Sequence, residues 1–320
     1  MKAAVYYENG PPSVLKYEDV PDPECHSSGV LIKVAAVSIE GGDTLSRSDG
    51  PLASSPHIVG YQAAGEILEV GAEVTHLEVG QNVTTVNAFG SHAELRAVPA
   101  RNAWLVPDGA DIQQAAAVPV PFGTADDCLF EFGRLQAGET VLVQAGASGV
   151  GLAAIQLAKR AGATVLATAS SAEKLERLAH FGVDHGINYV EDDLVEEVKR
   201  LTGGKGADVI VDPVGGTTLQ KSIHSLAYRG RLSMVGRAGR EDVKHDVSTL
   251  MHGNQTLSGV FLGAEIFSDR VHDLIQRHVD EVANDKLRVV IDSTFPLEDA
   301  AAAHTHIESR KAFGRVLLIP

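Results

Sequence analysis

The chain has 320 residues, of which 44% are hydrophobic, so it is long enough for two globular domains. Its 27 basic and 42 acidic residues give a formal net charge of −15, which makes nucleic acid and anionic membranes poor partners. No apolar run approaches the roughly 20 residues that span a bilayer, and Glu8 and Pro11 interrupt the N-terminus before a signal peptide could form. Cys25 and Cys128 are too far apart in the sequence to indicate a disulfide framework. We therefore expect a soluble cytoplasmic protein.

Residues 1–121 have the pattern of short strands separated by Gly and Pro turns. The clearest strands are Lys2–Tyr7, Gly29–Val37, Ala63–Val70 and Asn82–Val86. No long amphipathic helix is expected before the alanine-rich segment Ile112–Val118. This part of the chain is therefore predicted to be an all-β unit.

From residue 122 to residue 263, strands alternate with helices. The predicted strands are Val141–Gln144, Thr164–Ala169, Gly186–Asn188, Asp208–Val211, Leu232–Val235 and Leu257–Phe261. The predicted helices between them are Lys174–Phe181, Leu194–Thr202 and Thr217–Ala227. Alternation of this kind predicts a parallel sheet with helices packed on it.

A glycine-rich turn opens this region. The apolar run Val141–Val143 leads into Gly146–Gly151, and a helical apolar pattern follows at once. Glycines allow a ligand to approach the backbone closely, and the first N–H groups of a helix attract anions. We expect a pyrophosphate to bind at Gly146, Ser148, Gly149 and Val150.

Two other known sequence motifs match the residues of this turn less well. A hydrolase nucleophile elbow needs glycine where Val150 stands, and a triphosphatase loop needs a Gly-Lys-Ser/Thr ending that does not follow. The dinucleotide pattern G-x-G-x-x-G has its middle glycine replaced by Ser148. The turn is therefore interpreted as a variant dinucleotide fingerprint.

The pattern of the C-terminal residues is more similar to that of residues 1–121 than to the alternating strands and helices of residues 122–263. The segment Ser268–Lys286 is an amphipathic helix, and a strand Val289–Ser293, a helix Leu297–Glu308 and a strand Arg315–Ile319 follow. His304 and His306 are separated by one residue on that helix and should point to different faces, so they are not predicted to share a metal.

Taken together, these motifs resemble the medium-chain dehydrogenase/reductase superfamily, and in particular its zinc-independent quinone oxidoreductase (zeta-crystallin-like) branch. The resemblance covers essentially the whole chain. It rests on Ile58–Gly65, Val70–Val74, Val79–Gln81, Ala115–Pro119, Gln136–Glu139, Gly146–Gly151, Gly186–Tyr189, Asp212–Gly216 and Gly230-Arg231.

The resemblance implies an α/β protein with two domains. A GroES-like β-barrel catalytic domain would comprise residues 1–121 and 264–320, and a Rossmann doubly wound parallel sheet would bind the coenzyme with residues 122–263. Zinc-containing members have Cys and Gly-His-Glu where this chain has Glu40 and Gly60-Tyr61-Gln62. Since the thiolate and imidazole ligands are missing, no metal is expected.

The end of the strand Thr164–Ala169 indicates which nicotinamide cofactor is used. An NAD enzyme places an acidic residue there to bind the ribose hydroxyls, whereas this chain has Ser170, Ser171 and Lys174. Hydroxyls and an ammonium suit a 2′-phosphate, which a carboxylate would repel. The resemblance also places Tyr189 at that phosphate. We expect NADPH.

Without a metal, hydride transfer to a quinone or an α,β-unsaturated carbonyl is the more natural chemistry, because such acceptors stabilise the charge they gain. Glu40, Gln62 and Thr124 are the catalytic candidates, although Glu40 and Gln62 could equally be structural. The other residues that the resemblance places at the cofactor are Thr124, Val214, Val235, Gly236, Phe261, Leu262 and Arg315.

Two other functions stay open at this point. One is a catalytically weak NADPH-binding protein with a regulatory or structural role, and the other is an enoyl thioester reductase. The resemblance also implies a homodimer that pairs the strand Thr256–Leu262 with its copy, since an apolar edge strand needs a cover.

Overall fold

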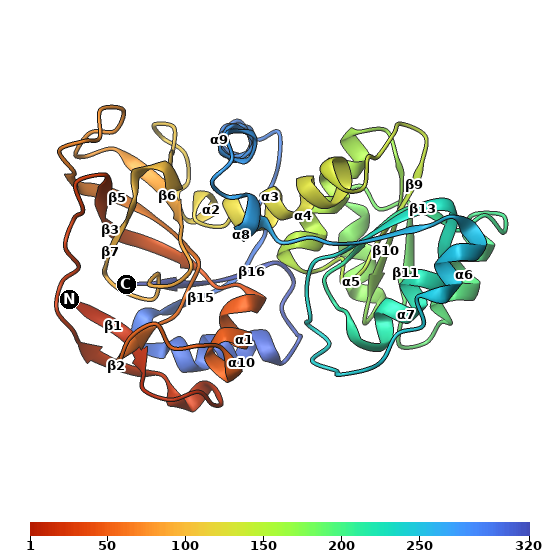
Figure 1. Cartoon of the computed structure of the whole chain (residues 1–320), viewed down its shortest axis with the longest axis horizontal. Helices are drawn as coiled ribbons and strands as arrows, with labels where there is room; N and C mark the ends of the chain where they lie inside the picture. The colour runs from red at the N-terminus through yellow and green to blue at the C-terminus, as the bar shows by residue number, and fades with distance from the viewer. The chain divides into compact units, whose positions relative to one another are not determined.

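Figure 1 shows the computed structural model, which describes residues 1–320. The chain divides into two units: unit 1 contains Met1–Val120 and Gly263–Pro320, and unit 2 contains Pro121–Leu262. Each unit is described by itself. No helix in the structure has both the length and the apolar character needed to cross a membrane.

Unit 1 is built mainly of strands. A three-stranded sheet has the order β2-β1-β4, and a seven-stranded sheet has the order β15-β16-β3-β5-β6-β8, with β7 also paired to β3. The bounds are β1 (Lys2–Tyr6), β2 (Lys16–Asp19), β3 (Gly29–Ser38), β4 (His57–Ile58), β5 (Gln62–Val70), β6 (Asn82–Val86), β7 (Leu95–Pro99), β8 (Ala103–Leu105), β15 (Ile291–Pro296) and β16 (Arg315–Ile319).

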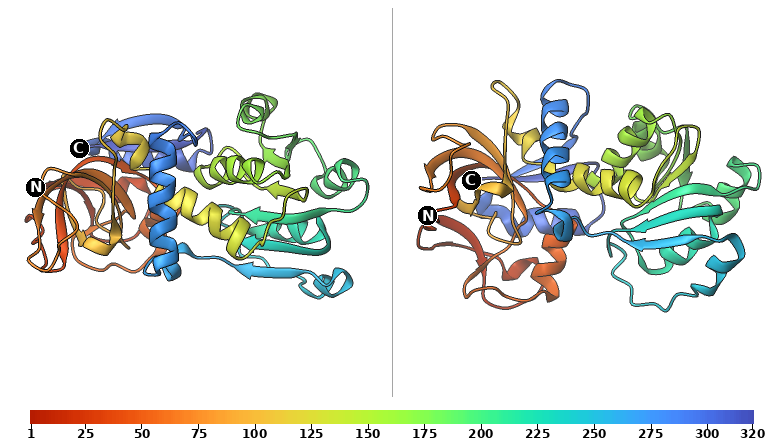
Figure 2. Two further views of the ribbon diagram at one scale, coloured as in Figure 1. Left: turned by 90° about the horizontal axis from the view of Figure 1, so that it is seen from above. Right: turned by 45° about the horizontal axis from the view of Figure 1, so that its top comes forward.

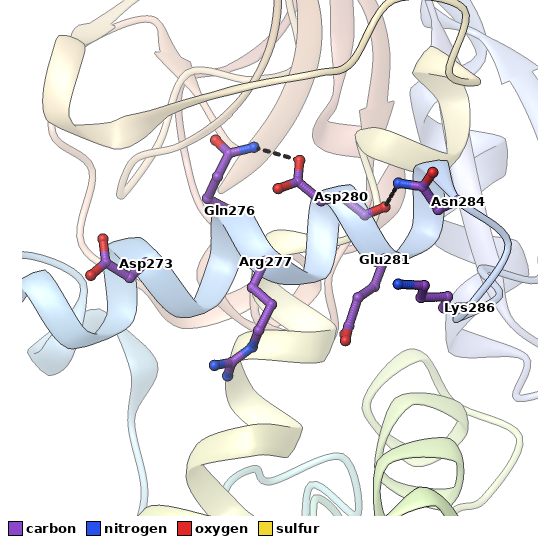
Figure 3. A pocket seen from close by; sticks show the side chains of 7 residues that line it. All are labelled: Asp273, Gln276, Arg277, Asp280, Glu281, Asn284 and Lys286. Carbon is purple, nitrogen blue, oxygen red and sulfur yellow. Dashed lines mark hydrogen bonds between the residues drawn. The ribbon is translucent and has the colours of Figure 1, made fainter.

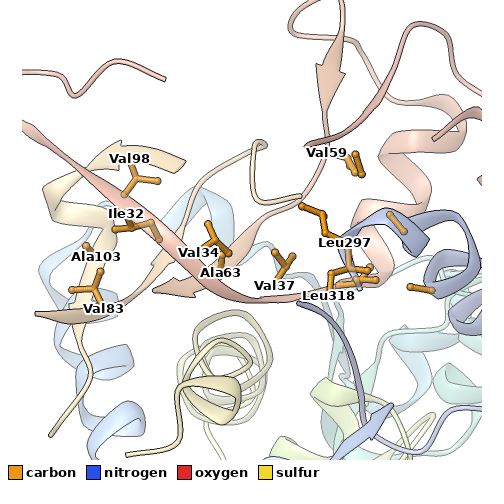
Figure 4. Packing of buried hydrophobic residues seen from close by; sticks show 14 of the residues in the cluster. Ile32, Val34, Val37, Val59, Ala63, Val83, Val98, Ala103, Leu297 and Leu318 are labelled. Carbon is orange, nitrogen blue, oxygen red and sulfur yellow. The ribbon is translucent and has the colours of Figure 1, made fainter. Parts of the chain in front are cut away.

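The centre of the unit 1 core is strand β3. Its neighbours β5, β7 and β16 all pair with it in the antiparallel sense. Side chains of Ile32 and Val34 point into one apolar cluster, because alternate residues of a strand face the same side. Val37 joins the same cluster after an irregularity in the pairing between Val34 and Ala36. Figure 4 shows them packed with residues from both ends of the chain, among them Ala63 and Leu318. The C-terminal residues therefore complete the core that the N-terminal strands begin.

The helices of unit 1 correct one prediction. Helix α1 (Gly41–Asp49) stands inside the region predicted to be all-β. Its two leading glycines and its mostly polar residues hid it from a search for amphipathic patterns. The other helices are α2 (Ile112–Ala115), α8 (Leu262–Glu265), α9 (Asp269–Ala283) and α10 (Ala300–Glu308), with short 3₁₀ turns η1 (Pro12–Val14), η2 (Ala100–Asn102) and η5 (Leu297–Asp299).

Unit 2 contains one sheet of six strands, and all its pairings are parallel. The strands are β9 (Thr140–Val143), β10 (Thr164–Ala169), β11 (His185–Asn188), β12 (Ala207–Asp212), β13 (Leu226–Met234) and β14 (Thr256–Gly259). The helical segments are α3 (Pro119–Asp126), the π-helical turn η3 (Asp127–Glu131), α4 (Gly149–Arg160), α5 (Ala172–Ala179), α6 (Leu194–Leu201), α7 (Gly216–His224) and the 3₁₀ turn η4 (Ser248–Gly253).

The strand order β11-β10-β9-β12-β13-β14 makes this a doubly wound sheet, as predicted. From β9 the chain winds in one direction through α4 and α5, and from β12 it winds in the other through α7. Right-handed crossovers then put these two sets of helices on opposite faces. Figure 2 shows the strands lying side by side with helices packed against them. The order reverses between β9 and β12, and ligands of such sheets bind at the carboxyl ends of strands at that point.

Several element bounds in unit 2 and its surroundings differ from the prediction. Strand β13 begins at Leu226 instead of Leu232, so the preceding helix ends at His224. Strand β14 ends at Gly259, before the predicted Leu262, which begins helix α8. The apolar run 256–262 does not indicate this end, because an apolar residue suits either a strand or the first turn of a buried helix.

Candidate active site

The glycine turn lies at the carboxyl end of β9. Helix α4 begins at Gly149, and the Ser148 hydroxyl caps it by accepting from the Gly151 N–H at 3.0 Å. The other first-turn N–H groups have no intrahelical partner and suit an anion. A Cβ on Gly151 would overlap with the carbonyl oxygens of Ala145 and Gly146, so only glycine lets the helix start this close to the strand.

The residues predicted to select the cofactor follow the next strand, β10. Ser170 and Ser171 come directly after it, and the Ser171 hydroxyl caps α5 by accepting from the Lys174 N–H at 3.3 Å. Tyr189 follows the neighbouring strand β11, with its backbone N–H donated to the Ala169 carbonyl at 3.2 Å and its side chain 45% exposed. The sheet thus brings these residues to one edge, and no acidic side chain stands among Ala169, Ser170 and Ser171.

Two further loops meet at the same edge. Val214 lies in the loop after β12, and Val235 and Gly236 lie after β13. Backbone bonds tie the loops together, because Ala238 N–H donates to the Pro213 carbonyl at 3.2 Å and Gly239 N–H donates to the Val214 carbonyl at 2.8 Å. Apart from Thr124, which lies in α3, the predicted cofactor residues of unit 2 therefore follow strands of one sheet.

A chain of buried side chains lies beneath these turns. The Thr168 hydroxyl donates to Gln144 Oε1 at 2.9 Å, Gln144 Nε2 donates to the Ser222 hydroxyl at 3.0 Å, and Ser222 donates to Asp212 Oδ2 at 2.8 Å. Burial raises the pKa of Asp212, and the N–H groups of Gly215 and Val214 and the Ser222 hydroxyl oppose that rise. Since all three neighbours donate, the geometry fits the carboxylate form.

These four hydrogen-bonded side chains were not among the predicted site residues. The sequence does contain one signal for it, since Asp212 ends a buried strand directly before Pro213-Val214-Gly215-Gly216. A carboxylate seldom ends a buried strand unless donors surround it. The other members, Gln144, Thr168 and Ser222, become recognisable only when β9, β10 and α7 are in place.

Unit 1 holds the other predicted residues in a second buried cluster. Arg315 is 7% exposed and forms an ion pair with Glu40, and it also donates to the Ser38 hydroxyl at 2.9 Å. Gln62 Nε2 donates to Glu40 Oε1, and Gln62 Oε1 accepts from the Val120 N–H at 3.0 Å. Burial raises the pKa of Glu40, and the Arg315 guanidinium opposes the rise. All the contacts to Glu40 are donors, so the carboxylate fits.

A second carboxyl group lies beside this pair. Asp43 is fully buried in α1, and its Oδ2 accepts from the Glu40 N–H at 2.8 Å while its Oδ1 has no partner. Burial, and to a smaller extent the charge of Glu40, raise the pKa of Asp43 to about 8, although Arg315 and Arg96 lower it. At neutral pH Asp43 is therefore mostly protonated, next to an ionised Glu40.

The remaining predicted residues are placed as follows. Thr124 is buried in α3, Leu262 is buried at the start of α8, and Phe261 is 72% exposed. His304 is buried against His92, whereas His306 contacts Asp292, so the two histidines do face different sides, as predicted.

A separate hollow of 420 Å³ lies along helix α9. Figure 3 shows side chains of both charges around it, including Arg277, Asp280 and Lys286, with Gln276 and Asn284 hydrogen-bonded to Asp280. It contains none of the predicted site residues, so it is not a part of the candidate site.

Family models match both parts of the chain. The alcohol dehydrogenase GroES-like domain matches residues 26–108, and the zinc-binding dehydrogenase model matches residues 149–294. The chain is 32% identical to a 2-haloacrylate reductase from Burkholderia sp over 99% of this chain and 98% of the relative. It is also 32% identical to a quinone oxidoreductase from Pseudomonas aeruginosa over 97% of both chains.

Among solved structures, the Escherichia coli quinone oxidoreductase complexed with NADPH superimposes with a TM-score of 0.95 at 29% identity, covering 100% of both chains. The chain belongs to the quinone oxidoreductase branch of the medium-chain dehydrogenase/reductase superfamily. The predicted combination of a GroES-like domain and a Rossmann sheet is thereby confirmed.

One matching family model is described as zinc-binding, but the residues of this chain offer a zinc ion no suitable set of ligands. Glu40 is paired with the guanidinium of Arg315, whose positive charge would repel a cation. The Tyr61 hydroxyl is 3.1 Å from the Ser46 hydroxyl, and no group of three His, Cys, Asp or Glu side chains could hold a metal ion. The residues present do not fit zinc.

A dinucleotide does fit this member of the family. The start of α4 offers N–H groups for a pyrophosphate, and the absence of a Cβ at Gly151 lets the helix begin directly against the turn at Ala145 and Gly146.

Proposed function

We propose that this chain is an NADPH-dependent oxidoreductase that reduces quinones or α,β-unsaturated carbonyl compounds without a metal. The observation that carries the proposal is the end of β10, where Ser170, Ser171 and Lys174 replace the carboxylate that would bind a ribose 2′-hydroxyl. The Escherichia coli relative solved with NADPH supports the same cofactor.

Bound NADPH would supply a hydride to an acceptor. The two relatives named above are a quinone oxidoreductase and a 2-haloacrylate reductase, which supports activated double bonds and quinones as the substrate class. Such acceptors stabilise the charge they gain, so the protein needs to orient the reactants more than it needs to polarise them.

Glu40, Gln62 and Thr124 are proposed to act in this orientation. Gln62 has both ends of its amide engaged, because it donates to Glu40 and accepts from the Val120 N–H in the first turn of α3. Thr124 lies one turn further along that helix. The geometry therefore supports a positioning role for Glu40 and Gln62, through α3. A proton-donor role for Glu40 would require Arg315 to move away.

The family resemblance also suggests the assembly. β14 is at the edge of the unit 2 sheet and leaves one side unpaired, and Phe261 just beyond it is 72% exposed. We propose a homodimer that pairs β14 with its copy, and a cytoplasmic location that fits two free cysteines and the net negative charge.

The proposal is tested by stopped-flow measurement of NADPH oxidation against a panel of quinones and enones. We expect saturable turnover with at least one acceptor. Tight NADPH binding without turnover of any acceptor would instead favour the regulatory alternative, whereas no NADPH binding would refute both.

Cofactor choice is tested with Lys174→Ala. Loss of one charge-assisted contact should weaken NADPH binding about tenfold and leave NADH binding within about twofold. Lys199→Ala is the matched control, since it removes an equal charge from the exposed face of α6. Equal weakening of NADPH and NADH by Lys174→Ala would contradict a 2′-phosphate contact.

A further inference from the structure

The polar chain Thr168–Gln144–Ser222–Asp212 has only one possible direction. The Ala145 N–H donates to the Thr168 hydroxyl at 3.0 Å, and a backbone N–H cannot accept. The Asp212 carboxylate can only accept, so Ser222 donates to Asp212, Gln144 Nε2 donates to Ser222, and Thr168 donates to Gln144 Oε1. Each link of this chain of side chains therefore has a fixed donor and a fixed acceptor.

Each end of this row of hydrogen-bonded side chains accepts hydrogen bonds from backbone N–H groups in a turn. At one end the Thr168 hydroxyl binds the Ala145 N–H, and at the other end Asp212 Oδ1 accepts from the N–H groups of Val214 and Gly215 at 2.8 and 2.9 Å. Ala145 begins the predicted pyrophosphate turn, and the other two begin the loop at the carboxyl end of β12.

The backbone at the Ala145 end needs such support. Ala145 has a φ of 50°, a left-handed conformation that costs a residue with a Cβ about 1 kcal/mol, whereas Gly215 adopts its φ of 65° without this cost because it is a glycine. A conformation of this kind persists only where the surrounding structure fixes it. Here the fixing contacts belong to one connected chain.

The place of the chain in the fold explains why it is buried. Gln144 follows β9 and Asp212 ends β12, the two strands between which the strand order reverses. All four side chains are at most 1% exposed, so water cannot replace a missing partner. A broken link therefore leaves buried donors or acceptors without partners at both of its neighbours.

We propose that Thr168, Gln144, Ser222 and Asp212 are positioning residues that act as one unit, joining the pyrophosphate turn to the 213–216 loop so that NADPH affinity depends on side chains that do not touch it. This inference rests on the proposed function, because it assumes that NADPH binds at the turn. Direct contact remains with the residues of the glycine turn and the end of β10.

The first measurement is the equilibrium dissociation constant of NADPH for wild type, Thr168→Val and Ser222→Ala, followed by NADPH fluorescence well below the melting temperature. Each single variant should weaken binding about tenfold, because its loss frees a turn from its fixed conformation. The double variant should be no weaker than the weaker single variant, because one break already releases the chain.

The second measurement uses the protein without cofactor. Amide hydrogen exchange of the 144–148 segment should become about tenfold faster in Ser222→Ala, although Ser222 lies three links away from the Ala145 amide. Ser233→Ala is the matched control: its buried hydroxyl donates to the Cys128 carbonyl at 2.9 Å and takes no part in the chain. It should leave both the dissociation constant and the exchange at 144–148 unchanged.

The outcomes separate the two proposals. If wild-type protein does not bind NADPH, the proposed function fails. If wild type binds NADPH and the variants lose only melting temperature, or if their effects on binding multiply in the double variant, the positioning unit is refuted while the proposed function stands.

Discussion

The two units bury polar groups in different ways. In unit 2 the chain from Thr168 to Asp212 contains one charge, and each donor and acceptor within it has a partner. In unit 1 the cluster around Glu40 gathers charges of both signs, and it leaves Asp43 Oδ1 and Arg96 Nε without partners. A hydrogen-bonded chain with one charge and no unpaired group fixes one geometry, whereas the geometry of a cluster of buried charges depends on which groups carry protons.

The single tryptophan allows the comparison to be measured unit by unit. Trp104 lies in unit 1, is 1% exposed and donates to the His272 carbonyl at 2.9 Å. Its fluorescence therefore reports unfolding of unit 1, while hydrogen exchange of β9 and β12 reports unit 2.

The largest effect is expected for Arg315→Met. Glu40 would remain buried without its cation, and breaking such a pair from one side costs about 3–5 kcal/mol. Urea denaturation followed by Trp104 fluorescence measures the loss in unit 1. The double variant Glu40→Gln with Arg315→Met should recover most of the stability, and a double variant as unstable as Arg315→Met would show that the charge is not the cause.

The next largest effect is the dependence of stability on pH that arises from Asp43. Its pKa is raised to about 8 in the folded state against 3.8 in the unfolded state, so the folded state holds an extra proton between these values. Stability from this group is present at low pH and is lost as pH rises to 8, by up to about 1.4 kcal/mol per pH unit. Asp43→Asn should flatten that decline between pH 5 and 8. An unchanged slope would contradict a protonated Asp43.

Two buried histidines are expected to have a smaller effect on the stability of unit 1, which they lower as pH falls. His92 Nε2 and His304 Nε2 are 3.0 Å apart, and Arg47 faces the other nitrogen of His304 at 3.4 Å. Burial, then the charge of Arg96, lowers the pKa of His92 to about 3, and burial also lowers the pKa of His304.

Because unfolded histidines bind protons below about pH 6.5, unit 1 should lose stability as pH falls from 6.5 towards 3. His92→Gln keeps a hydrogen-bonding side chain and should move the acid midpoint of Trp104 fluorescence to lower pH. A midpoint that stays in place would show that other groups control acid unfolding.

The smallest effect on stability is expected in unit 2. Ser222→Ala removes one neutral donor from Asp212 and should cost about 1 kcal/mol, seen as faster hydrogen exchange in β9 and β12. The urea midpoint of Trp104 should not move, since unit 1 is unchanged. A loss as large as that of Arg315→Met would remove the contrast between the units.

Several elements could be predicted because their patterns are local. The bounds of β6, β10 and β16 agree with the predicted strands to the residue, and the alternation of strands and helices predicted the parallel sheet. Helix α1 was missed, because its sequence GGDTLSRSD has almost no apolar stripe. Its first turn is stabilised instead by the hydrogen bond that the Glu40 N–H donates to Asp43 Oδ2.

The partners of the buried charges could not be predicted. Glu40 pairs with a residue 275 positions away, because β16 lies beside β3 in the sheet. Sequence alone left open whether Glu40 is catalytic or structural, since the distance between two side chains depends on how strands pair. The same holds for Gln144 and Ser222, which are 78 positions apart.

The sequence by itself determined the dinucleotide turn, the residues at the end of β10 and the absence of thiolate and imidazole ligands near Glu40, because each depends on residue type at short spacing. The tertiary structure alone decided which buried polar groups meet. It showed that Arg315, which the resemblance places at the cofactor, is the counterion of Glu40, and it brought Gln144, Thr168, Ser222 and Asp212 together beneath the glycine turn. The physical reason is that a buried hydrogen bond or ion pair needs both partners at contact distance, and only the packing of the sheets brings them there.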